Sequence, residues 1–154
     1  MIELRPVAQD NWNTLIKLKV REDQKNFVAS NLYSIAEAQF GFDEEGHWNL
    51  TPYGMYAEGT PVGFAMTGVN NGHSVFQGPI LRLMVHEKFQ GKGYGRAALE
   101  SMIAGFKADE DVKTVCISYE PYNEVARKLY ASLGFVETGE MFEGETVALL
   151  KLRP

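Results

Sequence analysis

The chain changes several times between the two hydrophobic periods that distinguish strands from helices. Residues 2–7 predict a first strand, and Asp10 then stands where it would cap a helix. The apolar face of that helix would consist of Trp12, Leu15, Ile16 and Leu18. The run Ser34-Ile35-Ala36-Glu37 has the spacing of a capping box, so a second short helix is predicted near residue 35.

The middle of the chain is dominated by strand patterns. Apolar runs over Tyr53–Ala57 and Val62–Thr67 flank a turn at Glu58-Gly59, which predicts a β-hairpin. A polar loop, residues 70–72, leads to another apolar strand over Ile80–Val85. Because these strands follow one another closely, the first half of the protein is predicted to form a largely antiparallel sheet.

The second half of the chain alternates helices and strands. Residues 94–107 predict an amphipathic helix, Thr114–Ser118 a buried strand, and Glu124–Leu133 a further helix. The inward stripe of this last helix would be Val125, Ala126, Leu129, Tyr130 and Leu133. Two strands that bracket Glu143-Gly144 follow, the second over Thr146–Leu152. The order predicts one mixed α/β domain over residues 1–154, with a strand–helix–strand crossover in its middle.

Composition and charge argue against several classes of protein. With 45% apolar and 23% charged residues, the 154-residue chain is typical of a globular protein, and no apolar run approaches the roughly 18 residues of a membrane span. Its beginning lacks the basic-then-apolar order of a signal peptide, so a cytoplasmic protein is expected. The net charge is −5 and the basic residues are scattered, which disfavours nucleic acid as a partner. The single cysteine, Cys116, excludes an internal disulfide and a multi-cysteine metal site, and no metal is expected.

The segment Gln90-Gly91-Lys92-Gly93-Tyr94-Gly95 follows an apolar strand and directly precedes an amphipathic helix. Glycines let successive backbone N–H groups approach a ligand, and the helix start adds its positive dipole end, so the expected guest is a phosphate or diphosphate. Lys92 and Arg96 would add charge at the rim. A Walker loop requires Ser or Thr where Gly93 stands, and a dinucleotide fingerprint requires glycine where Arg96 stands. The plain alternative is a glycine-rich turn that only begins a helix.

Two motifs in this order resemble those of the GNAT superfamily of N-acetyltransferases. The first is Gln90-x-x-Gly93-x-Gly95 behind the strand Leu83-Met84-Val85, and the second is Asn123-x-x-Ala126-x-x-Leu129-Tyr130-x-x-x-Gly134-Phe135. The resemblance implies an acyl-CoA N-acyltransferase fold of the α/β (α+β) class, with acetyl-CoA as co-substrate. That fold has a mixed, mostly antiparallel, twisted sheet of about six to seven strands, a splayed central strand pair and about four flanking helices.

The resemblance also assigns residues to the coenzyme. Backbone groups of Met84 and Val85 would hold the pantetheine arm as if it were an added strand, the amides from Gln90 to Arg96 would bind the diphosphate, and Asn123 would reach the pantetheine region. The expected coenzyme-binding residues are Leu83, Met84, Val85, Gln90, Gly91, Lys92, Gly93, Tyr94, Gly95, Arg96, Asn123, Ala126 and Tyr130.

Tyr130 is the expected general acid. A tyrosine hydroxyl and a departing thiolate have pKa values of about 10 and 8.5, so donation as the C–S bond breaks is feasible. Taken by its spacing alone, Tyr130 would be a core aromatic. A thiol inside an apolar strand is more often inert packing than a nucleophile, so we expect direct transfer in a ternary complex rather than an acyl-enzyme on Cys116.

The proton acceptor does not follow from the resemblance. An amine is mostly protonated at neutral pH, so a group must take its proton before it attacks. Many relatives carry an acidic residue on the strand before the loop, but this chain has Leu81-Arg82-Leu83-Met84 there. Glu120 is the first candidate, directly or through ordered water, with a solvated surface carboxylate as the alternative. His73 and His86 are weaker candidates.

The segment from Glu22 to Ala38 lies where this superfamily builds its acceptor wall, and it resembles the bacterial spermine/spermidine (diamine) acetyltransferase branch. The likeness rests on Gln24, Phe27, Val28, Ser34, Ala36 and Ala38, together with Gly63-Phe64-Ala65-Met66. A polyamine requires carboxylates for its ammonium groups and aromatic surface for its methylenes. The expected acceptor-binding residues are Glu22, Asp23, Phe27, Tyr33 and Glu37, and residues 40–48 add further acidic and aromatic side chains. A solvated acidic face is the alternative.

The function predicted from the sequence is N-acetylation of a small-molecule primary amine, preferably a polyamine such as spermidine or spermine. One alternative substrate is a peptide N-terminus or a protein lysine. A second alternative is a non-catalytic acyl-CoA-binding module, against which the intact Tyr130 argues. Similar enzymes often form homodimers, so a homodimer without nucleic-acid or membrane partners is expected.

Overall fold

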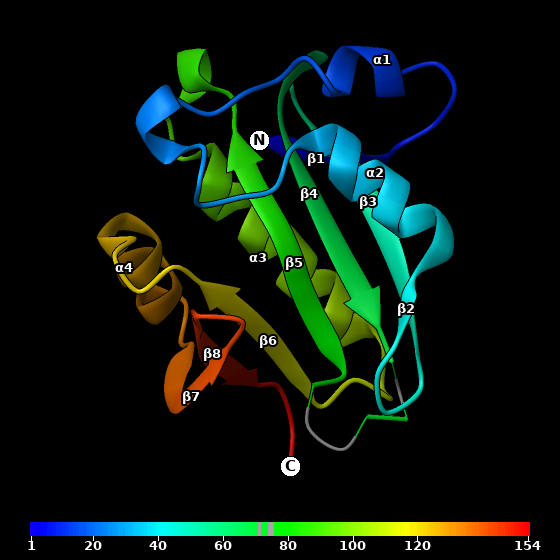
Figure 1. The fold of residues 1–154 in the computed structure, drawn as a ribbon, viewed down its shortest axis with the longest axis vertical. Helices are drawn as coiled ribbons and strands as arrows, with labels where there is room; N and C mark the ends of the chain where they lie inside the picture. The colour runs from blue at the N-terminus through cyan, green and yellow to red at the C-terminus, as the bar shows by residue number, and fades with distance from the viewer. Residues whose placement is uncertain (71, 74–75) are drawn as a thin grey trace.

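The described part of the chain forms one mixed sheet of eight strands (Figure 1). The computed structural model describes residues 1–70, 72–73 and 76–154. Across the sheet the strands follow in the order β1 (Ile2–Pro6), β3 (His47–Ala57), β4 (Thr60–Val69), β5 (Gly78–Val85), β6 (Thr114–Tyr119), β8 (Glu145–Lys151) and β7 (Val136–Phe142), while the short β2 (Phe42–Asp43) pairs with β3. All neighbouring strands are antiparallel except β5 and β6, which are parallel. The expectation of a mixed, mostly antiparallel sheet is confirmed.

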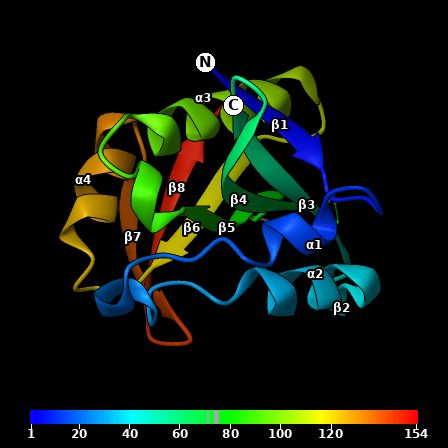
Figure 2. The same cartoon turned by 90° about the horizontal axis from the view of Figure 1, so that it is seen from above.

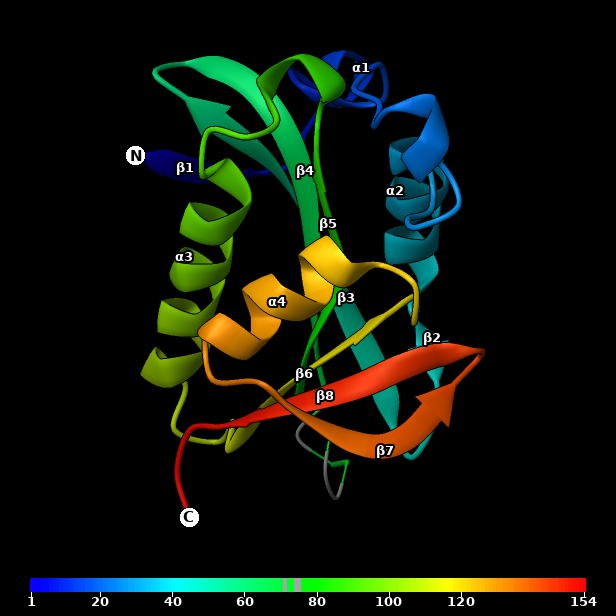
Figure 3. The same cartoon turned by 90° about the vertical axis from the view of Figure 1, so that its left-hand side faces the viewer.

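Helices cover both faces of this sheet, as Figures 2 and 3 show. The helices α3 (Tyr94–Ala108) and α4 (Glu124–Ser132) lie on one face, and α1 (Trp12–Leu15) and α2 (Asn31–Phe40) lie on the other. Two single 3₁₀ turns, η1 (Glu22–Gln24) and η2 (Glu87–Phe89), belong to the connections before α2 and before α3. The molecule therefore has three layers, with the sheet in the middle.

Each helical layer packs on its own hydrophobic core. The apolar stripe of α3, which includes Leu99 and Phe106, is buried together with Ile117 of β6. On the opposite face, Phe64, Met66 and Met84 are buried against apolar side chains of the α1–α2 region. Side chains alternate along a strand, so Ala65 of β4 packs in one core while its neighbours Phe64 and Met66 pack in the other. The sheet is thereby held between the two helical layers.

The parallel pair β5 and β6 separates after three residues. Their pairing covers only Gly78–Ile80 and Val115–Ile117, although β5 continues to Val85 and β6 to Tyr119. The separation begins at a bulge, because Met66 and Thr67 of β4 pair with Arg82 and Ile80, which leaves Leu81 as the extra residue. A bulge bends its strand and increases its twist, and here it turns β5 away from β6. The expected splayed central pair is thus present.

Most predicted elements are found, with two wrong helix starts near the N-terminus. The predicted cap Asp10 is not used, because Asn11 occupies the N-cap position of α1, which has only four residues and leaves Trp12 exposed. The predicted start at Ser34 is four residues late, because Ser30 caps α2 by accepting a hydrogen bond from the Tyr33 amide at 3.1 Å. Ser34 lies inside the helix.

Further corrections concern one side chain and one loop. Val125 was predicted to face inward on α4, but it is 81% exposed, whereas Ala126 and Tyr130 of the same stripe are buried. In the predicted polar loop, Asn71 lies outside the described residues and Asn70 is buried. Among the described residues, no helix is long and apolar enough to span a membrane.

Candidate active site

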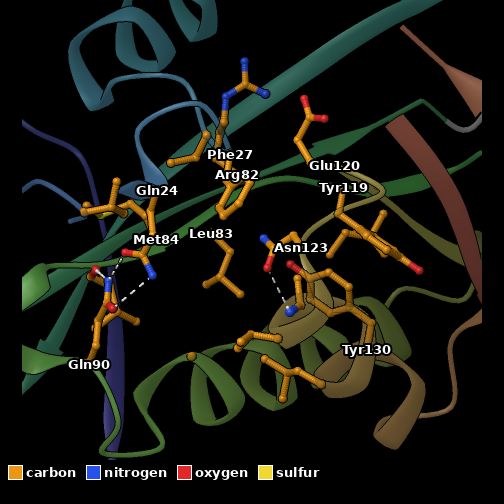
Figure 4. Close-up of a pocket in the computed structure, with 18 of the residues that line it drawn as sticks. Gln24, Phe27, Arg82, Leu83, Met84, Gln90, Tyr119, Glu120, Asn123 and Tyr130 are labelled. Carbon is orange, nitrogen blue, oxygen red and sulfur yellow. Dashed lines mark hydrogen bonds between the residues drawn. The ribbon is translucent and has the colours of Figure 1, made fainter. Parts of the chain in front are cut away.

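A cleft of about 1080 Å³ opens where β5 and β6 part (Figure 4). Its walls come from the segment around η1, from β5, from the glycine loop with the start of α3, from the end of β6 with α4, and from the turn between β7 and β8. Because the gap in the sheet connects the two faces, a ligand in this cleft can reach from the α3–α4 layer to the α1–α2 layer. The cleft is therefore the candidate site.

The glycine loop forms the wall at the mouth of α3. Gly91 and Gly93 have φ values of 77° and 83°, and Gly93 is the N-cap of the 15-residue helix. These left-handed conformations favour glycine, and a Cβ at either position would meet no atom within 4 Å, so the backbone is open to a ligand. The free N–H groups of the first turn and the positive end of the helix dipole make this surface suitable for a diphosphate.

Gln90 connects this loop to the opposite wall of the cleft. Its Nε2 donates to the Val85 carbonyl at 3.0 Å and to Gln24 Oε1 at 2.8 Å (Figure 4). The loop is thereby tied both to the end of β5 and to η1. All residues expected to bind the coenzyme line the cleft except Lys92, whose Nζ lies 5.8 Å from the ring centre of Phe89. Arg96 lines the cleft, although its guanidinium bonds Glu100 and Ser132.

The second motif has a physical explanation at both ends of α4. Asn123 Oδ1 accepts a hydrogen bond from the Ala126 amide at 3.2 Å, so this side chain caps the helix. At the other end, the Phe135 amide donates to the Tyr130 carbonyl and the Gly134 amide to Ala131, which is a Schellman motif. These local bonds determine where α4 begins and ends beside the cleft.

Tyr130 projects from α4 into the cleft. Its side chain is 8% exposed, and its ring lies 5.2 Å from the Tyr119 ring and 6.0 Å from the Phe135 ring. In Figure 4 its hydroxyl points from α4 toward Leu83 on β5, whereas Tyr119 points away and donates to Glu137 at 2.7 Å. Burial raises the pKa of the Tyr130 hydroxyl, so it stays protonated at physiological pH. It is thus a core aromatic and a cleft residue at once.

Charged groups gather where the cleft opens to the α1–α2 face. Arg82 donates to Glu37 at 3.2 Å and to Ser34 Oγ at 3.1 Å. The strand on which many relatives carry an acidic residue thus carries an arginine here, and Glu37 of α2 neutralises its charge. Glu120 lines the cleft at the end of β6, and Figure 4 shows it on the same side as Arg82, away from Tyr130. Glu145 lines the cleft from β8 and accepts a hydrogen bond from Ser118 Oγ at 3.2 Å.

Of the residues expected to bind the acceptor amine, some line the cleft and others lie outside it. Asp23 and Phe27 line the cleft. Glu22 does not, since it is exposed and paired with Lys25, and Tyr33 is 60% exposed on α2. Glu37 lies behind Arg82 rather than at the cleft surface. The acidic residues 43–45 lie around the β2–β3 turn, which contributes nothing to the lining of the cleft.

The two histidines named as weaker proton acceptors lie outside the cleft lining. His86 Nδ1 accepts a hydrogen bond from the Lys19 amide at 2.9 Å. His73 is buried beside Trp48 and Phe76, and its Nε2 lies 3.4 Å from a Glu45 oxygen. Cys116 is buried in β6, and this burial raises the pKa of its thiol to about 12, which leaves almost no thiolate at neutral pH.

Comparison with known proteins agrees with this geometry. Residues 12–135 match the profile of the Acetyltransferase (GNAT) family. The chain belongs to this family. It is 30% identical to the spermine/spermidine N(1)-acetyltransferase of Bacillus subtilis, over 98% of this chain and 99% of that protein. This GNAT protein is therefore an N-acetyltransferase, and the family expected from the two motifs is confirmed.

Solved structures share the GNAT fold of this chain. Aminoglycoside acetyltransferase AAC(6')-Ib in complex with coenzyme A superposes with a TM-score of 0.76 at 17% identity, covering 98% of this chain and 95% of that one. The PaiA N-acetyltransferase of Thermoplasma acidophilum, also in complex with coenzyme A, has a TM-score of 0.68 at 19% identity, covering 98% and 99%. At 17% and 19% sequence identity, the similarity to these two structures establishes a shared fold only.

Several cleft residues of this GNAT protein were not predicted from the sequence. They are Gln24 in its bond to Gln90, Arg82, Ser118, Glu143 and Glu145. The alternation of β6 was a usable signal for Ser118, because it lies two residues before Glu120 and shares its face of the sheet. The position of Glu145 depends on the pairing of β8 with β6, which no local pattern indicates.

Proposed function

We propose that this enzyme transfers the acetyl group of acetyl-CoA to a primary amine of a polyamine, such as spermidine or spermine, in a ternary complex. The observation that supports this most is that the two sides of the cleft carry different chemical groups. Its α3–α4 side carries an open glycine loop at a helix start, and its α1–α2 side carries carboxylates, with the separated strands β5 and β6 between them. A diphosphate-bearing coenzyme suits the first side, and an ammonium group suits the second.

The residues of the cleft fit acetyl-CoA, which supplies an activated acetyl group as a thioester. The amides from Gln90 to Arg96 would bind its diphosphate, since the loop is open and faces the cleft. The free edge of β5 at Leu83, Met84 and Val85 has no β6 partner, so its backbone groups would pair with the amides of the pantetheine arm. Asn123 would stand at the far side of that arm.

Proton transfers would be divided between the two sides of the cleft. Glu120 would take a proton from the ammonium group, directly or through ordered water, so that a neutral amine attacks. Tyr130 would donate its hydroxyl proton to the departing sulfur, and its raised pKa keeps that proton available at working pH. Direct transfer agrees with Cys116, whose protonated thiol is a poor nucleophile.

The polyamine is favoured because the curated relative is a spermine/spermidine acetyltransferase and because three cleft carboxylates, Glu120, Glu143 and Glu145, can face a polycation. Asp23 and Phe27 would add a charge and an aromatic surface from the η1 side.

We also expect a cytoplasmic homodimer without nucleic-acid or membrane partners. Light scattering on the purified protein tests the dimer.

A screen of amines with acetyl-CoA, monitored by release of free thiol, tests the function. Spermidine and spermine should turn over faster than peptides with a free N-terminus or a lysine. Faster turnover of the peptides would move the enzyme to the alternative substrate class. Binding of acetyl-CoA without turnover of any amine would indicate a non-catalytic module.

A further inference from the structure

Glu145 is the first residue of β8 and lies one step beyond the last pair of the β6–β8 ladder, Tyr119 and Thr146. Ser118 faces Val147 and Tyr119 faces Thr146 in this antiparallel pair, so the next facing residues are Glu120 and Glu145. Facing residues of an antiparallel pair project from the same side of the sheet. Glu145 Oε1 accepts the 3.2 Å hydrogen bond from Ser118 Oγ, which fixes its carboxylate on the face that Ser118 and Glu120 share.

The surroundings of Glu145 are mostly negative. Glu120, directly after β6, and Glu143, in the preceding turn, act on it as negative charges, while Arg82 on β5 acts on it as a positive charge. Arg82 is engaged by Glu37 and Ser34 and does not bond Glu145. Among the described residues, none forms an ion pair with Glu120, Glu143 or Glu145.

This environment changes the titration of Glu145. Half-burial is the largest cause that raises the pKa of Glu145, and Glu120 and Glu143 raise it further, while the Ser118 hydrogen bond and Arg82 lower it. Two facing carboxylates repel each other, and a cation placed between them would remove that repulsion. An ammonium group is such a cation, and the cleft gives it access to both carboxylates.

We propose that Glu145 and Glu120 act as a carboxylate pair that holds the reacting ammonium and accepts its proton. The proposal rests on the proposed amine acetylation and adds a second residue to the one named there. One N–H bond of the ammonium breaks, and one O–H bond forms on the pair, which changes from two negative charges to one. The electron pair left on nitrogen then attacks the acetyl carbonyl. Because the ammonium group would lie between the two carboxylates, either of them could accept its proton.

The pair predicts a pH-dependent defect in Glu145→Gln. Loss of a general base lowers the rate by about 10²-fold or more, so kcat/KM for spermidine should fall about 100-fold at pH 7. The defect should shrink as the pH approaches about 10, because the amine then loses its proton in solution. Glu140→Gln removes the same charge from the same hairpin outside the cleft and should leave the whole profile unchanged. A purely structural role of Glu145 would give a defect that is equal at all pH values.

Two further variants move the acid limb of the kcat/KM profile in opposite directions. The enzyme needs the pair ionised, so activity is lost as the pH falls through the raised pKa of Glu145. Ser118→Ala removes a hydrogen bond that lowers this pKa and should move the limb to higher pH. Glu120→Gln removes a charge that raises it and should move the limb of the remaining activity to lower pH.

The controls separate this proposal from the proposed function. Calorimetry should show wild-type affinity for coenzyme A in Glu145→Gln, which establishes that the variant is folded. If the wild-type protein acetylates spermidine and Glu145→Gln does so equally well at pH 7, the carboxylate pair is refuted while the function stands. If the wild-type protein acetylates no amine, the proposed function itself fails.

Discussion

Replacing Gly95 by alanine should stabilise the protein and weaken coenzyme binding. Gly95 is the second residue of α3 and has an ordinary helical conformation. The nearest atom to an added Cβ is Val85 Cγ2 at 3.8 Å, an ordinary contact, so the fold accepts the methyl group without movement. Alanine exceeds glycine in helix propensity by about 0.8–1 kcal/mol in a helix interior, and we expect about 0.5 kcal/mol in this first turn.

The same methyl group should interfere with the coenzyme, since Gly95 lines the cleft beside the amides proposed to bind the diphosphate. A loss of about 1.4 kcal/mol in binding corresponds to a tenfold higher Kd, and we expect at least this. Stability and affinity would thus change in opposite directions, which a general loss of structure cannot produce.

Gly105→Ala is the matched control for this substitution. Gly105 lies in the same helix, and a Cβ there meets nothing within 4 Å. It should raise the melting temperature by about 2–4 °C per kcal/mol gained, without an effect on coenzyme binding. Thermal unfolding and titration calorimetry with coenzyme A measure both quantities. Unchanged affinity in Gly95→Ala would show that the diphosphate does not approach this part of the loop, and the reasoning about the loop would be wrong.

The other predictions concern the acid, the thiol and the α4 cap. Tyr130→Phe should keep the ring contacts and coenzyme affinity but lower kcat about 10²-fold, and an unchanged single-turnover rate would remove its role as acid. Cys116→Ala should leave kcat unchanged, and loss of turnover together with a trapped acetyl-enzyme in the wild-type protein would contradict direct transfer. Asn123→Ala should cost about 1 kcal/mol in urea unfolding through loss of the cap, while Asn123→Asp should restore it, and equal destabilisation of both would exclude capping as the cause.

The parts of the fold that local sequence determines were predicted well. The turn Glu58-Gly59 joins β3 and β4 as expected, and the helix after Gly93 runs within one residue of its predicted length. Both depend on signals within a few neighbouring residues, namely turn-forming residues and a sustained helical period. The same holds for the second motif, whose spacing reflects a helix cap and a Schellman motif.

The two wrong helix starts arose where two nearby residues could each cap the helix. Asp10 and Asn11 are both good caps, and only the path of the chain decides that Asn11 takes the N-cap position. Ser34 has the correct capping-box spacing, but its hydroxyl donates to the Ser30 carbonyl inside a helix that has already begun. Local spacing cannot distinguish these cases.

The acceptor side of the cleft was beyond local patterns altogether. The bulge at Leu81 precedes Arg82, which bonds Ser34 and Glu37, and the pairing of β6 with β8 brings Glu145 to the end of β6, where Glu120 follows. Arg82 and Ser34 are 48 positions apart in the sequence, and Glu145 follows Glu120 by 145 − 120 = 25 positions. The residues that line the cleft from the glycine loop and α4 were therefore predicted more completely than those near Arg82 and Glu145.

A crystal structure of the protein with coenzyme A would show whether the glycine loop holds the diphosphate. We expect the diphosphate at the amides between Gln90 and Arg96, and the pantetheine arm along Leu83–Val85 in the gap between β5 and β6. A well-ordered coenzyme whose diphosphate lies away from this loop, or whose thiol lies outside the gap, would contradict this expectation.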